Sequence, residues 1–552
     1  MSMIETRQAQ MFPVLDAAQV ATARRFASGP ARTFPPGELL YDVGERNVPS
    51  WLLLEGAIEI NHHDGLGHHE QIAVEHAGQF TGEVSQLAGR GTLSAARAGP
   101  DGAVALPFDA PHLRALLIGA AELGEIIMRA LILRRMGLLE AGAAGAILVG
   151  AADHPDLVRL QVFLSRNGYP HAVLAAIGDG EGHALVERMG VAPAELPLMI
   201  CPNGTILRHP SNGEAAACLG LLVPPDPDKT YDVTVVGAGP AGLATAVYAA
   251  SEGLSVLVLD QRAMGGQAGA SARIENYLGF PTGISGQALA GRALNQAQKF
   301  GAEIAVPLEV TRLDCDIPRS DGDPLQLELS DGSRVRTRTV VIASGARYRR
   351  PAIPNIETLE GAGVSYWASA VEAKLCEGEE VALVGGGNSA GQATVFLAPK
   401  VNRLHLIVRG PGLEATMSRY LVDRIAALPN VELHAHTEIV GVEGDRAQGL
   451  TGATCRNRQT GETKYRPMRH LFLFIGADPN AGWLQGCVET DAKGFVVTGA
   501  NAGRPLETAR PGVFAIGDVR AGSTKRVAAA VGEGAAVVAQ IHAFLGGLTT
   551  TA

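Results

Sequence analysis

The segment Val-Val-Gly-Ala-Gly-Pro-Ala-Gly, residues 235–242, decides the fold of this 552-residue chain. It follows a short apolar strand and opens a helix rich in alanine. Gly237 makes the tight turn, Gly239 lets the backbone approach a pyrophosphate, and Gly242 packs helix against strand. The free N–H groups at the helix start then point at the phosphate charge. The segment predicts a Rossmann-like unit that binds a dinucleotide.

A second loop of this kind, Val-Gly-Gly-Gly-Asn-Ser-Ala at residues 384–390, lies about 150 residues further along the chain. It also follows an apolar strand, and Gly385, Gly387 and Ala390 occupy the matching positions. One glycine loop is weak evidence. Two loops in one chain are needed when electrons pass from one nucleotide cofactor to another, so the pair predicts an oxidoreductase.

Further segments accompany the first loop. A strand at residues 255–259 ends at Asp260, close to the spacing at which an acid accepts from ribose hydroxyls. Downstream segments are Gly265-Gly266-Gln267, Ile274-Glu275-Asn276-Tyr277, Val513-Phe-Ala-Ile-Gly517-Asp518-Val519-Arg520 and Lys525-Arg526-Val527-Ala528. With these motifs, residues 231–552 resemble the low-molecular-weight thioredoxin reductase family.

The resemblance implies FAD at the first loop, with Gly517 and Asp518 at the ribityl chain and the next helix start facing the isoalloxazine ring. The predicted FAD-binding residues are Gly237, Gly239, Pro240, Ala241, Gly242, Asp260, Gln261, Gly266, Gln267, Asn276, Gly517, Asp518, Arg526, Val527 and Ala528. The alternative is a Rossmann-like protein without flavin.

The second loop is then expected to bind the nicotinamide nucleotide. The strand after it, residues 403–408, ends at Arg409 rather than at an acid. A cation suits a 2′-phosphate, so NADPH is favoured and NADH stays open, as does a surface role for Arg409. The predicted NADPH-binding residues are Gly385, Gly387, Asn388, Ser389, Ala390 and Arg409.

The redox dithiol of this family has no counterpart in the chain. The resemblance implies a Cys-x-x-Cys before the second glycine loop, where this chain has Gly363-Val-Ser-Tyr-Trp-Ala-Ser-Ala-Val371. The two cysteines fall on Trp367 and Ala370, or with a one-residue gap on Ala368 and Val371. None of the six cysteines forms a CxxC, and Cys376 alone cannot cycle as a dithiol. No catalytic side chain is therefore assigned, because the flavin carries the chemistry.

The composition restricts the class of protein. Hydrophobic residues make up 46% of the chain and charged residues 18%, so each of three or four domains can bury a core. A net charge of −10 argues against nucleic-acid or anionic-membrane binding. The chain shows no signal peptide and no charge-free apolar stretch that would span a bilayer. With scattered cysteines, which fit a reducing compartment, we expect a cytoplasmic protein without membrane contact.

The N-terminal region has a pattern of its own. Short strand-like runs with glycines fill residues 31–105, and a helical tail follows from about Ala110 to Leu139. This order is similar to a cyclic-nucleotide-binding domain, a β-barrel with a helical tail, which we place at residues 12–140. The resemblance implies a Gly-Glu pair and, about ten residues later, an Arg for the cyclic phosphate.

The predicted effector site lacks its arginine. Gly82 and Glu83 are present, but Thr92 falls where the Arg belongs, and Arg90 lies two residues early. A buried phosphate without its cation is strongly disfavoured. Binding of cAMP, cGMP or another nucleotide at Gly82, Glu83, Arg90 and Thr92 therefore stays open.

Residues 146–222 predict a third unit. A strand at 146–149, a helix, a strand at 171–175, a helix, and a hairpin through Asn203-Gly204 follow in order. This order resembles a thioredoxin or glutaredoxin fold, with Pro197 in the place of its cis-proline. Its redox segment reads Gly150-Ala-Ala-Asp-His-Pro155 without cysteine, which favours a docking or spacer domain over a redox relay.

The predicted architecture is α/β and multidomain. A proline-rich linker at 223–230 leads to an FAD domain, 231–345 and 473–552, interrupted by an NAD(P)H domain at 346–472. We expect an FAD-dependent NAD(P)H oxidoreductase with an N-terminal regulatory module, an unidentified small-molecule or small redox-protein acceptor, no metal site, and a homodimer. The alternatives are a ferredoxin or flavodoxin reductase, a thioredoxin-disulfide reductase using an external thiol, and a nucleotide-sensing flavoprotein with incidental turnover.

Overall fold

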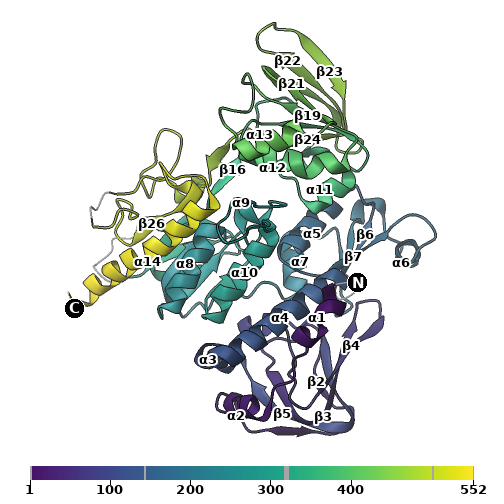
Figure 1. Cartoon of the computed structure of the whole chain (residues 1–552), viewed down its shortest axis with the longest axis vertical. Coiled ribbons are helices and arrows are strands. Elements are labelled where there is room, and N and C mark those ends of the chain that lie inside the picture. The colour runs from purple at the N-terminus through teal and green to yellow at the C-terminus, as the bar shows by residue number, and fades with distance from the viewer. Residues whose placement is uncertain (1–2, 142–144, 316–322, 500–502, 551–552) are drawn as a thin grey trace.

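The computed structural model describes residues 3–141, 145–315, 323–499 and 503–550, so the predicted FAD domain includes three short stretches outside the described residues. The described strands form six sheets, which we describe as four regions (Figure 1). Rossmann-like α/β sheets make up the second half, as the glycine loops predict.

The first region is an antiparallel sheet with flanking helices. Its strands run in the order β1-β5-β3-β4, with β2 paired to β5. Its elements are α1 (Met3–Met11), α2 (Ala17–Arg24), β1 (Arg32–Phe34), β2 (Leu39–Tyr41), β3 (Ser50–His63), β4 (His69–His76), the 3₁₀ helix η1 (Val84–Ala88), β5 (Ala95–Phe108), α3 (Ala110–Gly119) and α4 (Ala121–Ala141). Among the described residues this sheet does not close into the predicted barrel.

The predicted helical tail is two helices rather than one. The carboxyl terminus of α3 is capped at Ala120, whose φ of −125° and ψ of 79° leave the helical region, and α4 starts again at Ala121. Both helices pack on the sheet through a shared apolar cluster that includes Leu116 and Leu131.

The second region is a four-stranded sheet in the order β7-β6-β8-β9. β6 pairs with β7 in parallel and with β8 antiparallel, and the β8–β9 hairpin turns through Asn203-Gly204. Its elements are β6 (Ala146–Gly150), α5 (Pro155–Arg166), β7 (His171–Ala175), α6 (Glu181–Met189), η2 (Pro193–Glu195), β8 (Leu198–Ile200), β9 (Ile206–Arg208) and α7 (Asn212–Cys218).

The third region contains the first glycine loop. Its seven-stranded sheet has a parallel core of β12, β11, β10, β15 and β26, buried by alanine-rich helices. Its elements are β10 (Thr230–Val236), α8 (Pro240–Ser251), β11 (Val256–Leu259), α9 (Gly266–Gly269), α10 (Gly286–Lys299), β12 (Glu303–Ala305), β13 (Val310–Leu313), β14 (Leu325–Leu329), β15 (Arg334–Ile342), β26 (Val513–Ala515), η5 (Gly517–Val519) and α14 (Val527–Thr550).

The fourth region is inserted between β15 and β26 and contains the second loop. A parallel sheet, β17-β24-β18-β19-β20, is joined by the small sheet β21-β22-β23 and by the pair β16-β25. Its elements are β16 (Ala346–Tyr348), β17 (Val364–Ser365), α11 (Ala370–Leu375), β18 (Glu380–Val384), α12 (Asn388–Leu397), η3 (Ala398–Lys400), β19 (Arg403–Ile407), α13 (Arg419–Ala426), β20 (Val431–His434), β21 (Thr437–Asp445), β22 (Gly449–Asn457), β23 (Thr463–Pro467), β24 (His470–Leu473), β25 (Ala477–Pro479) and η4 (Gly482–Leu484).

One described helix, α14, is long and apolar enough over Val527–Gly547 to cross a membrane by length and composition. It is not free of charge, since Glu533 pairs with Arg520 at 2.5 Å. Val538 and Ile541 pack into the core beside α8, so one face of α14 belongs to the core of the third region (Figure 1).

Candidate functional site

A cleft of about 2440 Å³ lies where the third and fourth regions face each other, and both glycine loops line it. The first glycine loop fits a phosphate cradle. Gly237 has a φ of +114°, and a Cβ there would lie 2.3 Å from the carbonyl oxygen of Ala343. Gly239 is the N-cap of α8, with Pro240 in its first turn. A Cβ at Gly242 would lie 1.9 Å from the Gly237 carbonyl oxygen, so this glycine keeps the loop tight without lining the cleft.

Asp260 lies directly beside this loop. Its Oδ2 accepts from the Ala238 N–H at 2.9 Å, and its Oδ1 accepts from the Arg262 N–H at 2.8 Å. A carboxylate has about four acceptor positions, which leaves capacity for a ribose hydroxyl. The structure brings Asp260 to the cleft together with Gln261, Gly266, Gln267 and Asn276.

The C-terminal segment reaches the same cleft. Asp518 lines it, and burial raises the pKa of Asp518 despite the nearby Lys525, which donates to the Asp518 carbonyl at 2.5 Å. Gly517 is not among the residues that line the cleft, and its N–H donates to Glu533 at 2.6 Å. Arg526, Val527 and Ala528 line the cleft as well.

The second loop has the same construction. A Cβ at Gly385 would lie 2.6 Å from the carbonyl oxygen of Phe474, and Gly387 is the N-cap of α12. Asn388 and Ser389 line the cleft, and Asn388 Oδ1 accepts from the Ser418 N–H at 2.7 Å. Ala390 lines the cleft and packs in the core of the fourth region.

Arg409 also lines the cleft, and it belongs to a cationic cluster. Arg456 chiefly, then Arg458 and Arg409, lowers the pKa of Glu438. Arg456 Nη2 lies 2.7 Å from Glu438 Oε1. Arg456 and Arg458 come from β22 and the turn after it. They lie far from Arg409 in the sequence, so the pattern around the second glycine loop does not predict them.

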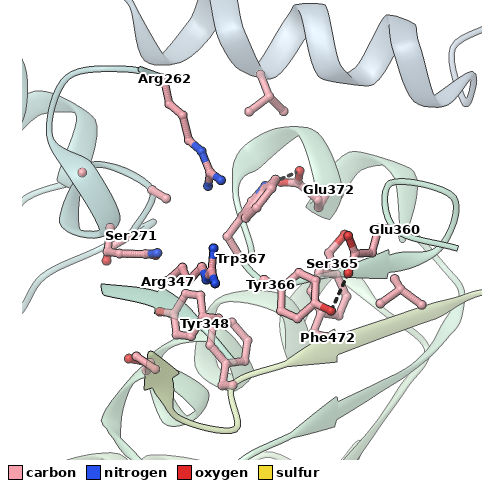
Figure 2. A pocket seen from close by; sticks show the side chains of 18 of the residues that line it. Arg262, Ser271, Arg347, Tyr348, Glu360, Ser365, Tyr366, Trp367, Glu372 and Phe472 are labelled. Carbon is pink, nitrogen blue, oxygen red and sulfur yellow. Dashed lines mark hydrogen bonds between the residues drawn. The ribbon is translucent and has the colours of Figure 1, made fainter. Parts of the chain in front are cut away.

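Trp367 lines the same cleft as the two loops, at a position where the resemblance places a cysteine (Figure 2). Its Nε1–H donates to Glu372 Oε1 at 2.8 Å, and Glu372 also caps α11 by accepting from the Ser369 N–H at 3.0 Å. Ala370 begins α11, Ala368 is buried in the core, and Val371 is part-buried outside the cleft lining.

Three residues around Trp367 were not found from the sequence. Arg262, Arg347 and Tyr348 line the same part of the cleft (Figure 2). The Tyr348 phenol is hydrogen-bonded with Ser389, and burial raises its pKa, with a smaller contribution from Asp518. Tyr348 therefore contacts the second nucleotide loop, with Asp518 close enough to act on its pKa, and no motif marks it.

No cysteine lines the cleft within the described residues. Cys376 is fully buried, and burial, Glu372 and Glu379 raise its pKa to about 12. Cys455 is also buried. The other four form the disulfides Cys201–Cys218 and Cys315–Cys487. The sequence did not reveal these two pairs, because pairing depends on distance in space, and a cytoplasmic location stays a prediction.

Helix α5 of the second region lines the cleft, and it lies beside α11 of the fourth region (Figure 1). The segment at its amino end, where a thioredoxin-like fold has its redox motif, lines the cleft through Ala151, Asp153, His154 and Pro155. Ser165 O accepts from Gln287 Nε2 at 2.6 Å, and Arg166 Nη2 donates to Gly266 O at 2.7 Å. Asp156 lies 3.4 Å from Arg446. The helix thus contacts both nucleotide-binding regions.

The predicted effector residues each have protein partners, although Glu83 lies close enough to Arg90 to act on its pKa. Arg90 is buried and donates from Nη2 to the Ile304 carbonyl of β12 at 3.1 Å, and burial lowers its pKa to about 10. Thr92 Oγ1 donates to Asp42 O at 2.6 Å. Glu83, after Gly82, accepts from the Ser85 N–H and lies 3.6 Å from Arg135. In this arrangement the Arg90 guanidinium points into the third region, and a phosphate-binding role for Arg90 stays a prediction.

Comparisons with known proteins agree with this geometry. Residues 231–534 match the pyridine nucleotide-disulphide oxidoreductase family. The F component of the alkyl hydroperoxide reductase of Escherichia coli is 32% identical over 306 residues, 55% of this chain and 56% of that protein. The thioredoxin reductase of Aquifex aeolicus is 32% identical over 322 residues, 58% of this chain and 95% of that protein.

A solved structure shares the fold. The crystal structure of Lactococcus lactis thioredoxin reductase in its FR conformation covers 57% of this chain and 99% of its own, with a TM-score of 0.52 and 28% identity. This chain spans about half the length of the alkyl hydroperoxide reductase component, so its first 230 residues stand outside these matches. The chain therefore belongs to the pyridine nucleotide-disulphide oxidoreductase family, and its matched part is an FAD-dependent NAD(P)H oxidoreductase.

Proposed function

We propose that this protein passes reducing equivalents from NADPH through FAD to an external acceptor, without an internal dithiol. The observation that carries the proposal is the single cleft lined by both glycine loops, with Trp367 and no cysteine between them in the part of the chain that the structure describes. Bound FAD and NADPH supply hydride transfer. The residues of this chain hold the cofactors and exclude water.

The proposed roles follow from the contacts. Gly237 to Gly242 and the start of α8 hold the FAD pyrophosphate, with Asp260 at the ribose and Asp518 at the ribityl chain. Gly385 to Ala390 hold the nicotinamide nucleotide, with Arg409 at the 2′-phosphate. Tyr348 and Trp367 exclude water between the two sites.

We propose a small planar acceptor such as a quinone, with a small redox protein as the alternative. Support comes from the aromatic side chains of Tyr348 and Trp367, which line the cleft together with α5 and offer flat surfaces to a planar ring.

Stopped-flow spectroscopy tests this function. The chromophore released by denaturation is expected to be FAD, and anaerobic NADPH is expected to bleach it in the intact protein. The bleached protein is then mixed separately with menadione, ferredoxin, flavodoxin and thioredoxin. Fast reoxidation by the quinone alone supports the proposal. Release of FMN, or no bleaching by either nicotinamide nucleotide, would falsify it.

We also propose that residues 12–140 are a cyclic-nucleotide-binding-like module and residues 146–222 a thioredoxin-like module without redox function. The strand order β7-β6-β8-β9, with one parallel and two antiparallel pairings, supports the second. The antiparallel sheet followed by α3 and α4 supports the first.

These modules are proposed to regulate the enzyme rather than to bind its substrate. The family resemblance implies a homodimer whose nucleotide domains rotate to bring nicotinamide to flavin, and α5 contacts both domains. Calorimetric titration with cAMP and with cGMP tests a nucleotide effector. Because Arg90 is engaged with β12, we expect no binding at micromolar concentration, and micromolar affinity would contradict this assignment of Arg90.

A further inference from the structure

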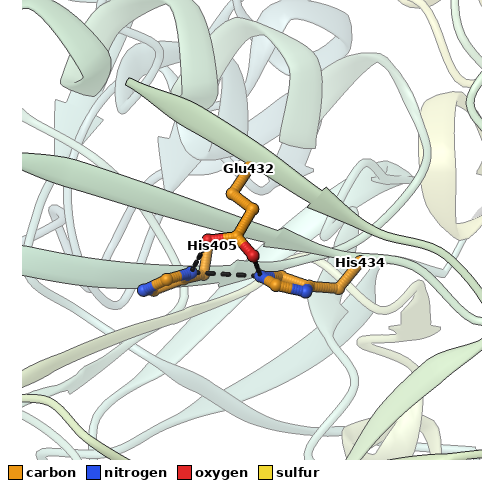
Figure 3. Close-up of side chains that lie close together, drawn as sticks. All are labelled: His405, Glu432 and His434. Carbon is orange, nitrogen blue, oxygen red and sulfur yellow. Dashed lines mark hydrogen bonds and ion pairs between the residues drawn. The ribbon is translucent and has the colours of Figure 1, made fainter. Parts of the chain in front are cut away.

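Three metal-ligand side chains meet on two neighbouring strands of the fourth region (Figure 3). In the parallel pair β19–β20, His405 lies opposite Glu432, and Ile407 lies opposite His434. Side chains two apart on a strand share a face, so His405, Glu432 and His434 emerge on one side of the sheet. β20 is the edge strand, and none of the three residues lines the cofactor cleft.

The distances fit a tetrahedral metal ion. His405 Nδ1 lies 3.0 Å from His434 Nε2. Glu432 Oε2 lies 3.4 Å from His405 Nδ1, and Glu432 Oε1 lies 3.6 Å from His434 Nε2. Zinc bonds of about 2.0–2.2 Å at tetrahedral angles place neighbouring ligand atoms about 3.3 Å apart. A zinc ion therefore fits among these atoms with only a small adjustment of side chains.

A carboxylate, that of Glu380, lies beside the second ring nitrogen of His405. Glu380 Oε2 lies 3.4 Å from His405 Nε2, the nitrogen that points away from the cluster. Histidines that bind metals usually donate their other N–H to such a group, which fixes the ligating nitrogen. Here Glu380 leaves Nδ1 of His405 as the ligand atom.

A positively charged side chain lies beside the second histidine, His434. Arg466 Nη2, from β23, lies 3.5 Å from His434 Nδ1. When His434 Nε2 binds a cation, Nδ1 carries the proton and faces the guanidinium, which weakens binding. If a cation binds at His434, removal of the Arg466 charge should strengthen its binding.

We propose that His405, Glu432 and His434 form a zinc site that joins the edge strand β20 to β19. Two imidazoles and one carboxylate suit Zn²⁺ better than Mg²⁺ or Ca²⁺, which prefer all-oxygen sites. The side chain of His405 is 5% exposed, that of His434 14% and that of Glu432 49%. The fourth ligand position thus faces water, and the site serves the sheet rather than the cofactor cleft.

The test uses the full-length flavoprotein after chelator treatment. Calorimetry with Zn²⁺ is expected to show one ion per chain, and Co²⁺ is expected to give the intense visible bands of a tetrahedral complex. His434→Ala and the conservative Glu432→Gln should each weaken binding on the order of 100-fold, and Glu380→Gln about 10-fold. His542→Ala, an exposed histidine on α14, is the matched control and should bind as the wild type does.

Arg466→Gln is expected to have the opposite effect to these variants. Removal of the guanidinium charge beside His434 should tighten Zn²⁺ binding several-fold. Flavin content and circular dichroism show whether each variant is folded. Zn²⁺ should also raise the melting temperature of the wild type and of His542→Ala, but not of His434→Ala. The proposal is overturned if Zn²⁺ does not bind, or if His434→Ala and Glu432→Gln bind it as tightly as the wild type.

Discussion

Arg409 lies directly after the strand that follows the second glycine loop, and the choice between NADPH and NADH is expected to depend on it. Loss of one charge-assisted contact typically costs about 1.5–3 kcal/mol, or on the order of 10- to 100-fold. Arg409→Ala should therefore raise the KM for NADPH by this factor and leave NADH use nearly unchanged. Arg419→Ala, an exposed arginine on α13, is the control. An equal loss with both nucleotides would assign Arg409 a structural role.

Cys376 is expected to be chemically silent. With a pKa of about 12, only on the order of one thiol in 10,000 is ionised at pH 8, and the thiolate is the reactive form. Maleimide should leave Cys376 unmodified in the native protein at pH 8, and Cys376→Ser should keep NADPH-to-quinone activity. Thioredoxin-dependent turnover that disappears in Cys376→Ser would contradict this and indicate a thiol route.

At the scale of residues, the phosphate cradles could be predicted because their chemistry is local. The turn at Gly237 and the cap at Gly239 depend only on neighbouring backbone. Tyr348 and the three candidate zinc ligands could not be predicted, because strand pairing and domain contacts bring them to their neighbours. The contact of Arg90 could not be predicted for the same reason: its partner, Ile304, is 214 residues away.

At the scale of elements, the buried pair between β4 and α4 makes the first region sensitive to pH. Glu75 lies 3.1 Å from Arg134, and both are buried. Burial raises the pKa of Glu75 to about 7, against a smaller opposing effect of Arg134. A raised carboxyl pKa means that the native state holds its proton more tightly than the unfolded state. The contribution of Glu75 to the stability of the first region is therefore greatest below about pH 4.5, and it is lost as the pH rises through about 7.

Hydrogen exchange of the β4 amides at pH 5 and pH 8, corrected for intrinsic exchange rates, measures this effect. The opening free energy of wild-type β4 should be lower at pH 8, and Glu75→Gln should remove most of the difference. Glu70→Gln, an exposed carboxyl on the same strand, should keep it. A difference that persists in Glu75→Gln would mean that another group titrates.

The sequence predicted individual elements better than their assembly. Alternating and helical patterns identified the strands and helices of the second region almost residue by residue. Closure of the first sheet was predicted but is not found among the described strands, because β1 and β4, at the two ends of the strand order, do not pair with each other. The break between α3 and α4 at Ala120 follows Gly119, a helix-stop signal that the prediction did not use.

At the scale of the whole molecule, α5 and the loop after it link the two nucleotide-binding regions that the family resemblance expects to rotate. On the third region, Gln287 Nε2 donates to Ser165 O at 2.6 Å, and Gly266 O accepts from Arg166 Nη2 at 2.7 Å. On the fourth region, Arg446 lies 3.4 Å from Asp156. A well-formed hydrogen bond contributes about 1 kcal/mol, whereas an exposed ion pair contributes less. If the domain rotation must break such contacts, their energies add to its barrier and slow it.

The double variant Gln287→Ala, Arg446→Ala tests this restraint. Losing about 1 to 1.5 kcal/mol of contact should speed flavin reduction by NADPH about 5- to 10-fold in single-turnover stopped flow, provided that rotation limits the rate. Arg188→Ala on α6 changes an exposed charge of the same module away from the cleft and should leave the rate unchanged. Each variant must first retain its flavin and its melting temperature. A rate that is unchanged or slower in the double variant would show that α5 does not restrain the nucleotide domains, and the N-terminal half would then need another role.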